Sequence, residues 1–375
     1  MSKVNMIPRV TLNDLRVLIP TIGAKNNERP FITPIIQSEP GCGKTSLLGM
    51  MAEDNGDKWR RAGDNYESDK YDYIYVDCPV KDMSDVGMAI PNHATKTLEY
   101  YVASLFRLDS PKPKIVLLDE FMKAPKLLQV IFTRLMLEQM VGDEPLPVGS
   151  VVFGTSNNQS DGVGDTMLAH AGNRVCILEM QKPDVPTWLE YATKKGISRI
   201  VRAFVAMYPK VLKSYRDEGQ EDNMTIFHPS KPQLSFCSPR SLEKSDVIVR
   251  YADKFGESVT MAALAGTIGA SAAADMITFI SMEKSVLDVK DIIKNPSNVH
   301  MPNEIAAQLL IMFQALDVLE TQDELSSFME FVNRIDSSEV QSIFFSLILS
   351  NKRTVKIARN NEQIKTWAKD NHKLF

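Results

Sequence analysis

A glycine-rich stretch, Gly41-Cys42-Gly43-Lys44-Thr45, lies between an apolar run and a segment with helical periodicity. Glycine permits the tight turn in which successive backbone N–H groups point at phosphate oxygens. A helix that begins directly after such a turn adds a dipole that favours an anion. The Lys44 ammonium suits β- and γ-phosphates, and the Thr45 hydroxyl suits Mg²⁺. The spacing therefore predicts a phosphate-binding loop.

We expect the whole loop to contribute to binding, and its residues are Ser38, Glu39, Pro40, Gly41, Cys42, Gly43, Lys44, Thr45 and Ser46. The strict form of the motif has glycine where this chain has Ser38, but its GxGKT core is intact. The alternative is an accidental glycine-rich turn that carries an exposed lysine. A strand predicted before the loop and a helix predicted after it favour phosphate binding.

Two acids, Asp119 and Glu120, follow an apolar run at residues 115–118. In phosphoryl transfer, Asp119 would hold the magnesium shell beside Thr45, and Glu120 would orient and polarise the attacking water as a general base. The alternative is a strand that simply ends in a solvated acidic turn. The phosphate loop upstream favours the catalytic interpretation.

Short apolar runs predict strands that alternate with helices in the first half of the chain, which indicates a parallel sheet covered on both faces. The predicted strands are residues 31–36, 73–76, 114–118, 151–155 and 174–178, and the predicted helices are 11–22, 44–52 and 127–140. After Met180 the pattern becomes helical. Helices are predicted at 186–194, 198–207, 241–255, 259–282, 305–319, 324–334, 340–349 and 362–372, with a long loop at 213–236 and a linker at 296–302.

The composition is that of an ordinary globular protein, with 375 residues, 44% hydrophobic and 24% charged. A chain of this length buries a large core without disulfides or metal. The formal net charge of -4 lacks the basic excess of a dedicated nucleic-acid binder, although a local basic patch is compatible with that total. The four cysteines lack paired metal-ligand spacing, which indicates reduced thiols.

Nothing in the sequence indicates a membrane protein. Residues 1–16 contain no apolar core of the signal-peptide kind. The uncharged stretch at 258–274 is rich in small residues and too weakly apolar to span a bilayer, so we interpret it as buried helix. We therefore expect a cytoplasmic protein.

Several segments in order resemble the AAA+ ATPases, and within them the MoxR-like group. SEPGCGKT resembles the Walker A loop and IVLLDEF the Walker B strand, while residues 82–87 resemble the segment that runs toward the pore. Residues 127–147 resemble the helix and hairpin after Walker B, and VFGTSN at 152–157 resembles the sensor 1 strand. Gly172-Asn173-Arg174 resembles an arginine-finger site and Ser238-Pro239-Arg240-Ser241 a sensor 2 motif. The resemblance covers about residues 30–250.

The resemblance implies an α/β fold, an AAA+ αβα sandwich with a parallel sheet, followed by an all-helical lid and a helical C-terminal extension. The implied boundaries are an N-terminal helical segment at 1–28, the nucleotide-binding domain at 29–180, the lid at 181–295 and the extension at 296–375.

Three further site residues are carried over from the family. Asn157 would contact the attacking water or the γ-phosphate, with Asn158 as a rival for that role. Arg174 would act on the nucleotide of a neighbouring subunit, and Arg240 would sense nucleotide from the lid. The alternatives are a surface arginine at a strand start for Arg174 and a first-turn helix residue for Arg240. Trp59, beside two arginines, is interpreted as part of a solvated loop face.

The implied function is ATP binding and hydrolysis with Mg²⁺ in a homo-oligomeric ring, a hexamer, that remodels or matures a protein partner. Members of the group often act with a von Willebrand A-type partner. One alternative is a DNA-directed AAA+ motor or loader, and another is an ATP-gated scaffold with negligible hydrolysis. Intact Lys44, Asp119 and Glu120 argue against the scaffold. The sequence does not distinguish adenine from guanine.

Overall fold

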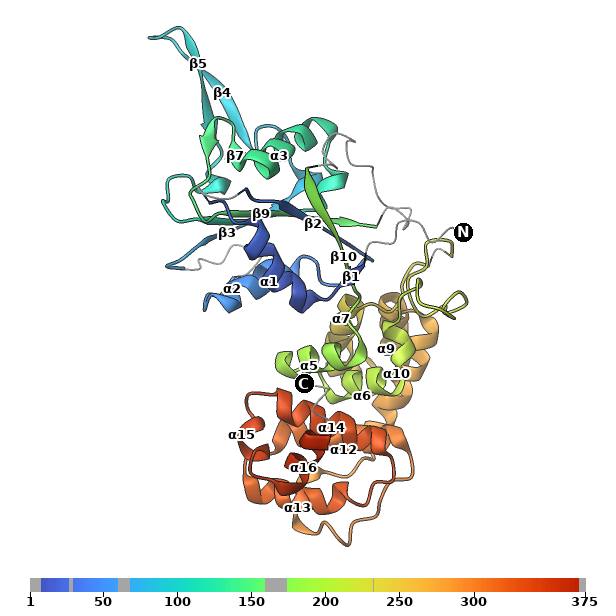
Figure 1. The fold of residues 1–375 in the computed structure, drawn as a ribbon. Coiled ribbons are helices and arrows are strands. Elements are labelled where there is room, and N and C mark those ends of the chain that lie inside the picture. Colours follow the sequence, from blue (N-terminus) through green and yellow to red (C-terminus); the bar gives the residue numbers. More distant parts are fainter. Residues whose placement is uncertain (1–7, 27–29, 60–67, 159–173, 232, 371–375) are drawn as a thin grey trace. The chain divides into compact units, whose positions relative to one another are not determined.

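The computed structural model describes residues 8–26, 30–59, 68–158, 174–231 and 233–370 (Figure 1). The chain divides into two compact units, Met1–Lys182 and Pro183–Phe375. The first unit contains the β-sheet, and the described part of the second is helical.

A six-stranded sheet forms the centre of the first unit, in the order β1-β10-β2-β9-β6-β3, and its neighbouring strands pair in parallel. The strands are β1 (Arg9–Val10), β2 (Thr33–Ser38), β3 (Asp72–Asp77), β6 (Lys114–Asp119), β9 (Val151–Asn157) and β10 (Val175–Met180). The helices are α1 (Leu12–Gly23), α2 (Ser46–Asp54) and α3 (Lys126–Glu138), with 3₁₀ turns η1 (Cys78–Val80), η2 (Ser104–Phe106) and η3 (Phe121–Lys123).

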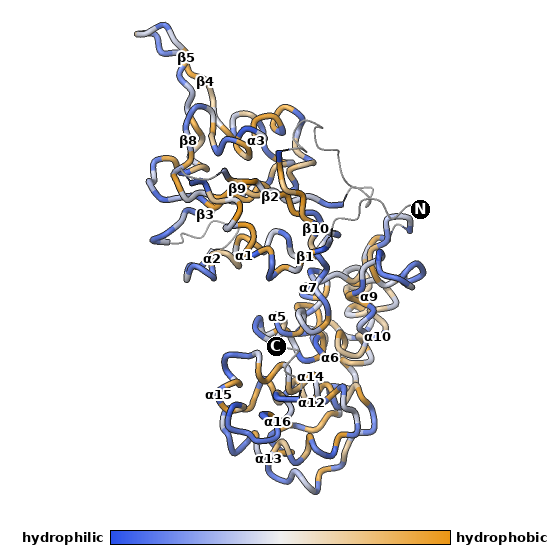
Figure 2. Tube along the Cα trace, in the orientation of Figure 1, coloured by the Kyte–Doolittle hydropathy of each residue, from blue (hydrophilic) through white to orange (hydrophobic). Residues whose placement is uncertain are grey.

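Helices cover both sides of the sheet (Figure 1), and the central strands are largely hydrophobic along the chain (Figure 2). Successive side chains of a strand point to opposite faces. Ile35 of β2 packs in the cluster that includes α3, whereas its neighbour Ile36 packs in the cluster that includes α1 and α2. On β9, Val152 and Phe153 divide in the same way. This double burial explains the continuous apolar runs from which the strands were predicted.

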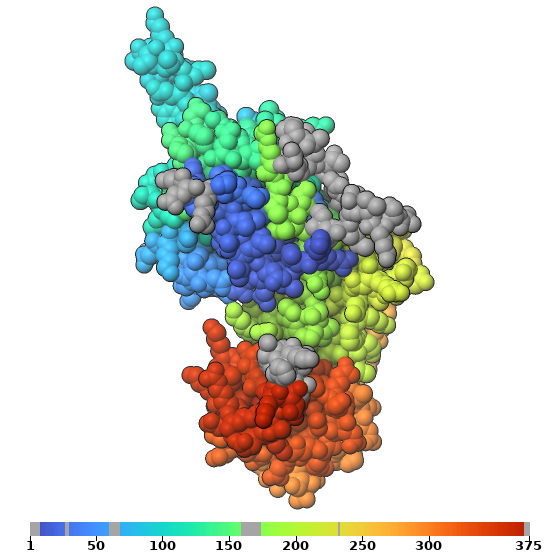
Figure 3. Space-filling model, in the orientation of Figure 1, coloured from blue at the N-terminus to red at the C-terminus, as the bar shows by residue number. Residues whose placement is uncertain are grey.

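Two antiparallel hairpins extend from this layered core. The first consists of β4 (Gly87–Asn92) and β5 (Thr97–Val102), and the second of β7 (Met140–Val141) and β8 (Glu144–Pro145). In Figures 1 and 3 the β4–β5 hairpin projects away from the rest of the first unit. The sequence analysis did not predict it, whereas a hairpin after α3 was implied by the family resemblance.

The second unit is organised around a single hydrophobic cluster that includes residues from Trp188 to Ile364. The expected boundary at residue 295 between a lid and an extension lies inside this unit. Its helices are α5 (Val185–Lys195), α6 (Arg199–Met207), α7 (Pro239–Arg250), α8 (Ala252–Phe255), α9 (Glu257–Ile268), α10 (Ala270–Glu283), α11 (Val289–Lys294), α12 (Ile305–Val318), α13 (Gln322–Val332), α14 (Ser338–Ser350), α15 (Val355–Ala358) and α16 (Glu362–Asp370), with the 3₁₀ turn η5 (Pro209–Leu212).

The predicted fold class is confirmed: an αβα parallel sheet precedes a helical region. Two helix predictions are wrong in their continuity. The helix expected at 259–282 is broken at Gly269, whose φ of +89° is left-handed and where a Cβ would lie 3.2 Å from the Ser235 carbonyl oxygen. The helix expected at 241–255 ends at Arg250, and α8 follows it after Tyr251.

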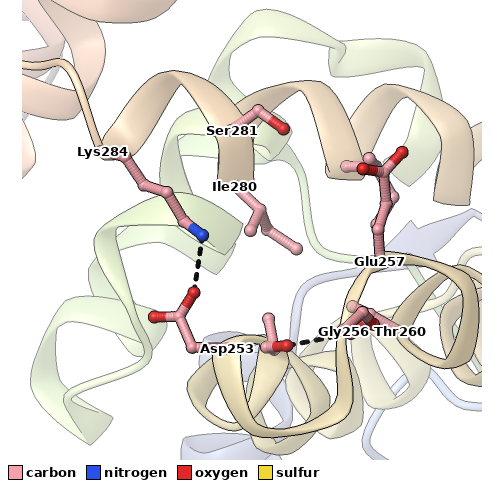
Figure 4. A pocket seen from close by; sticks show the side chains of 9 residues that line it. Asp253, Gly256, Glu257, Thr260, Ile280, Ser281 and Lys284 are labelled. Atoms are coloured by element: carbon pink, nitrogen blue, oxygen red, sulfur yellow. Dashed lines mark hydrogen bonds and ion pairs between the residues drawn. The ribbon is translucent and has the colours of Figure 1, made fainter.

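A small pocket lies between α8, α9 and α10 in the second unit (Figure 4). The Asp253–Lys284 ion pair, 2.6 Å long, crosses its rim, and Glu257 and Ser281 add polar atoms. Both charged side chains are largely exposed, so solvent screens the pair. Among the described residues, no helix is both long enough and apolar enough to cross a membrane.

Candidate functional site

Polar residues meet where parallel strands of the sheet end. Ser38 at the end of β2 pairs with Asn157 at the end of β9, and Asp77 at the end of β3 pairs with Asp119 at the end of β6. Ligands of open α/β sheets bind outside the carboxyl ends of the strands. The fold thus gathers most of the predicted site residues at this edge.

The phosphate loop connects β2 with α2 as the sequence predicted. Gly41 and Gly43 have φ angles of +76° and +96°, which L side chains rarely adopt, so glycine is required at both turns. The Ser46 amide donates to the Gly43 carbonyl at 2.9 Å and starts the helix. The loop therefore lies at a helix N-terminus, where an anion is favoured.

The Lys44 side chain is buried, with 7% of its surface exposed, and it is held by oxygen atoms. Its Nζ donates to the Ser38 carbonyl at 3.0 Å, to Ser38 Oγ at 3.1 Å and to the Glu39 carbonyl at 3.2 Å. It also donates to Asn157 Oδ1 at 3.0 Å. The Lys44 ammonium is therefore hydrogen-bonded to four oxygen atoms. Phosphate oxygens of a bound ligand could replace these acceptors.

Ser38 is the residue at which the loop departs from the strict glycine motif. Its hydroxyl donates to the Glu39 carbonyl at 3.1 Å while it accepts from Lys44. The residue is 1% exposed. Serine in place of glycine thus adds one hydrogen-bond acceptor for the Lys44 ammonium. The turns at Gly41 and Gly43 are unaffected.

Asp119 is buried and accepts hydrogen bonds from three hydroxyl groups. Thr45 Oγ1 and Tyr75 Oη both donate to Asp119 Oδ2 at 2.9 Å, and Thr155 Oγ1 donates to Oδ1. Thr45 and Asp119 are the two residues that the sequence analysis assigned to a metal, and the structure brings their oxygens into contact.

These oxygen donors fit Mg²⁺. Magnesium prefers hard oxygen ligands and is usually held by one or two carboxylates together with substrate phosphates and water. Among the described residues, no group of three or more His, Cys, Asp or Glu side chains forms a metal cage. A site of one carboxylate and one hydroxyl beside a phosphate loop therefore suits a metal that arrives with a phosphorylated ligand.

Glu120 follows Asp119 in a left-handed conformation, with φ of +51°. Its amide donates to Thr155 Oγ1 at 3.1 Å, so one hydroxyl contacts both acidic residues. Its carboxylate accepts from Lys123 Nζ at 2.9 Å, and 38% of its side chain is exposed. The structure thus places Glu120 at the site with its carboxylate engaged by a neighbouring cation.

The structure separates the two candidates for the sensor asparagine. The side-chain oxygen Oδ1 of Asn157 accepts from Lys44 Nζ, and Asn157 pairs with Ser38 across the sheet. Asn158, also buried, lies one position beyond the strand. Asn157, the residue preferred from the sequence, is thus the one that contacts the loop lysine, and its role as a sensor stays a prediction.

Charged residues also surround Cys42 on the phosphate loop. Burial raises the pKa of the Cys42 thiol to about 11, although the Lys182 and Lys44 cations act in the opposite direction. Glu39 Oε2 lies 3.8 Å from Lys182 Nζ, and both side chains are 5% exposed. A thiol with this pKa is protonated at neutral pH, so we interpret Cys42 as a packing residue.

Arg174 lies far from the phosphate loop of its own chain. It is exposed and precedes Val175, which pairs with Thr33 at the opposite end of β2 from Ser38. At about 3.3 Å per residue, the two ends of β2 are about 16 Å apart. Gly172 and Asn173 of the same motif lie outside the described residues, as do the two arginines that follow Trp59.

Arg240 is an exposed residue in the first turn of α7, in the second unit. Ser238 caps this helix and forms a capping box with Ser241. The helix start predicted at this motif is therefore present.

Four contact residues at this edge escaped the sequence analysis: Tyr75, Thr155, Lys123 and Lys182. Thr155 and Asn157 are two positions apart on β9 and so point to the same face, which is a signal that could have identified Thr155. Tyr75 and Lys182 have no local motif. Their roles depend on strand pairing that a single sequence does not display.

Comparisons with known proteins give distant similarities. No family model matches the chain, and no curated protein matches it. A solved structure of NtrX from Brucella abortus in complex with ADP has a TM-score of 0.39 at 13% identity, over 91% of this chain and 70% of that one. A point variant of RuvB from Thermotoga maritima has a TM-score of 0.36 at 12% identity, over 88% and 87% of the two chains. At such scores the site geometry has to carry the functional argument.

Proposed function

We propose that the chain is an AAA+ ATPase of the MoxR-like group, which binds ATP with Mg²⁺ at residues 38–46 and hydrolyses it. The observation that carries this proposal is the convergence of three strand ends on the loop. Lys44 Nζ lies 3.0 Å from Asn157 Oδ1, and Thr45 Oγ1 lies 2.9 Å from Asp119 Oδ2. A cation for phosphate, an oxygen pair for magnesium and an amide for water are thereby placed together.

In this proposal each residue has a separate task in water attack on the γ-phosphate. Lys44 exchanges its loop acceptors for β- and γ-phosphate oxygens. Thr45 and Asp119 would hold Mg²⁺, which would supply positive charge beside the phosphate oxygens. Glu120 leaves Lys123 and accepts a proton from the attacking water. Asn157, released by Lys44, orients that water.

We further propose that the active form is a homo-oligomeric ring, a hexamer, because Arg174 is exposed at the far edge of the sheet. An arginine about 16 Å from its own loop along the strand direction is suited to the nucleotide of a neighbour. Its planar guanidinium can match the equatorial oxygens of the transferred phosphoryl group. Arg240 of the second unit would report nucleotide occupancy.

The β4–β5 hairpin supports remodelling of a protein partner as the work of the ring. Met88 and Tyr101 pair directly across the hairpin, and Ile90 lies on the same face, so three exposed apolar side chains form one patch. Exposed apolar patches mark interaction surfaces. Glu99, which pairs with Ile90, gives this face an acidic rather than a basic charge. The patch therefore favours a protein over DNA as the partner.

The hairpin is anchored to the rest of the first unit by an aromatic ring. Tyr100 packs against Gly142 in the turn of the β7–β8 hairpin, where a Cβ would lie 2.3 Å from the ring. Gly87 accommodates the same ring, with a Cβ position 2.6 Å from the Tyr100 hydroxyl. This close packing at two glycines connects the hairpin to the segment that follows α3.

The test is direct measurement of MgATP binding and phosphate release by the full chain and by Lys44→Ala. Hydrogen bonds to charged groups contribute about 1.5–3 kcal/mol, so affinity should fall about tenfold to a hundredfold in the variant. Lys126→Ala, at an exposed position that begins α3, is the matched control and should behave as wild type. A wild-type protein that neither binds nor hydrolyses ATP contradicts the proposal.

A further inference from the structure

Two opposite charges are buried together at the phosphate loop, one on the loop residue Glu39 and the other on Lys182. Glu39 Oε2 and Lys182 Nζ are 3.8 Å apart, and each side chain is 5% exposed. Burying a charge is costly unless it is paired. A carboxylate beside an anion site also opposes binding of the anion. The pair therefore calls for a role other than contact with phosphate.

Glu39 connects the Lys44 side chain to this pair. Its carbonyl accepts from Lys44 Nζ at 3.2 Å and from Ser38 Oγ at 3.1 Å, while its carboxylate faces Lys182. If phosphate oxygens withdraw the Lys44 ammonium, the Glu39 carbonyl loses one of these donors. Glu39, the residue that contacts Lys182, therefore has one hydrogen bond fewer at its carbonyl when the loop is occupied than when it is empty.

Lys182 is the last residue of the first unit, and Pro183 begins the second. The preceding residue is fixed to the sheet, because the Gln181 amide donates to the Val10 carbonyl at 2.8 Å. Asp184 follows Pro183 and caps α5 by accepting from the Thr187 amide at 3.0 Å. Pro183 restricts the backbone between Lys182 and Asp184, so the connection from the sheet to the cap of α5 has few accessible conformations.

We propose that the Glu39–Lys182 ion pair couples nucleotide occupancy of the phosphate loop to the connection between the two units. This inference rests on the proposed nucleotide binding and assigns a positioning role to Lys182. In the empty loop the pair fixes the connection through Glu39. When nucleotide occupies the loop, the Glu39 carbonyl loses its hydrogen bond from Lys44. The ion pair of Glu39 with Lys182 then changes, and so does the conformation at the start of α5.

The experiment is hydrogen–deuterium exchange of the full chain with and without MgADP, followed at the phosphate loop and at the segment 184–188, whose backbone N–H groups are those of Asp184, Val185, Thr187 and Trp188 because Pro186 has none. In wild type, MgADP should change the exchange rates at 184–188 by about fivefold or more, the lower range of coupling between sites. In Lys182→Met the phosphate loop should still respond to MgADP, whereas residues 184–188 should not. Lys182→Arg keeps the charge and should restore the response.

Glu179→Gln is the matched control, because it removes a 3.1 Å ion pair between Glu179 on β10, the strand that precedes Lys182, and Arg9 on β1, and should leave the response intact. Should Lys182→Met fail to fold because the buried Glu39 carboxylate loses this cation, Glu39→Gln/Lys182→Met removes both charges and should also lack the response.

A response at 184–188 that persists in Lys182→Met or in the double variant overturns the coupling. Loss of MgADP binding in Lys182→Met overturns it as well, because the lysine would then belong to the binding site itself. A wild-type protein that binds MgADP without any change at 184–188 refutes the coupling alone. A wild-type protein that binds no nucleotide refutes the proposed function, and the inference with it.

Discussion

The Lys44 ammonium donates to the Asn157 amide oxygen at 3.0 Å, across 113 positions of sequence. The lysine belongs to the loop after β2 and the asparagine ends β9, so this bond joins two neighbouring strand ends. Both groups have tasks in the proposed reaction, one with phosphate and one with water. A ligand that draws the Lys44 ammonium toward its phosphates therefore also breaks the hydrogen bond to Asn157, and the Asn157 side chain becomes available to another partner.

Replacement of this asparagine should slow the reaction more than it weakens binding. In Asn157→Ala we expect kcat for ATP hydrolysis to fall about a hundredfold, the loss typical of one preorganised hydrogen-bonding group. Nucleotide affinity should change much less, because Lys44 keeps its Ser38 and Glu39 acceptors. Steady-state phosphate release and equilibrium binding measure the two effects.

Asn158→Ala is the matched control, since the residue is adjacent, buried and chemically identical. It should retain most of the activity. The opposite ranking of the two variants would transfer the role to Asn158.

Glu120→Gln should bind ATP and hydrolyse it very slowly. The amide preserves the shape of the side chain but cannot accept the proton of water, and positioned general bases contribute about 10²–10⁴-fold. The variant should therefore accumulate in its ATP-bound assembled form, detectable by size-exclusion chromatography with ATP. Lys123→Gln removes the partner of Glu120 while leaving the carboxylate in place, so it should stay active. Normal turnover by Glu120→Gln would remove the general base from this mechanism.

A buried ion pair at the start of the edge strand β3 and its neighbour β6 should contribute to the stability of the first unit. Lys114 Nζ on β6 lies 2.6 Å from Asp72 Oδ2 on β3, and the lysine side chain is fully buried. Asp72→Asn leaves that ammonium without its counter-charge, which should cost about 3 kcal/mol. Amide exchange of β3 and β6 measures the loss locally. The Asp72→Leu/Lys114→Met variant should lose less than Asp72→Asn does, because it leaves no charge buried.

The contribution of this pair should depend on pH. Burial acts to raise the pKa of Asp72, but hydrogen bonds from Lys114 and Ser110 and the cationic charges of Lys114 and Arg107 outweigh it, so the pKa lies below its ordinary value. A depressed pKa contributes stability above the unfolded value of about 3.9, and this stability is lost as pH falls through the folded pKa. The stability difference between wild type and Asp72→Asn should therefore shrink in acid. A difference that grows below pH ~4 would contradict the assignment.

The phosphate loop and the acidic residues at the carboxyl ends of the strands could be located from the sequence because they are attached to strong local patterns. Lys44 lies in the glycine-rich turn that follows the apolar strand β2. Asp119 is the last residue of the apolar strand β6, and a second acid, Glu120, follows it. The β4–β5 hairpin had no such signal, because Met88 and Ile90 are exposed and make no core that would impose a pattern. Gly269 gave a visible signal, but its left-handed turn was interpreted as small-residue packing within one helix.

Residues that act through partners distant in sequence were not predictable. Tyr75 contacts Asp119 because β3 pairs with β6, and Lys182 contacts Glu39 because β10 pairs with β2. Neither pairing follows from composition or periodicity. Strand order is a tertiary property that places chemically ordinary residues beside the loop.

Arg174 should act on the nucleotide of a neighbouring subunit. Its Cα precedes β10 at the sheet edge opposite the phosphate loop, so its own site is out of reach. An arginine that stabilises phosphoryl-transfer charge contributes about 10³–10⁵-fold in GTPase examples. Arg174→Ala should therefore bind ATP with near wild-type affinity and hydrolyse it very slowly. Specific activity of the wild type should rise with protein concentration until rings form.

Mixing two inactive variants distinguishes action between subunits from action within one. Arg174→Ala retains Lys44, and Lys44→Ala retains Arg174, so a mixed ring contains interfaces at which an intact loop faces an intact arginine. Activity should return on mixing, in an amount that follows the fraction of mixed rings measured by native mass spectrometry. Each variant alone should stay inactive at the same total concentration. If mixed rings form and no activity returns, Arg174 is not the finger, and a monomer with concentration-independent ATPase activity would exclude the ring itself.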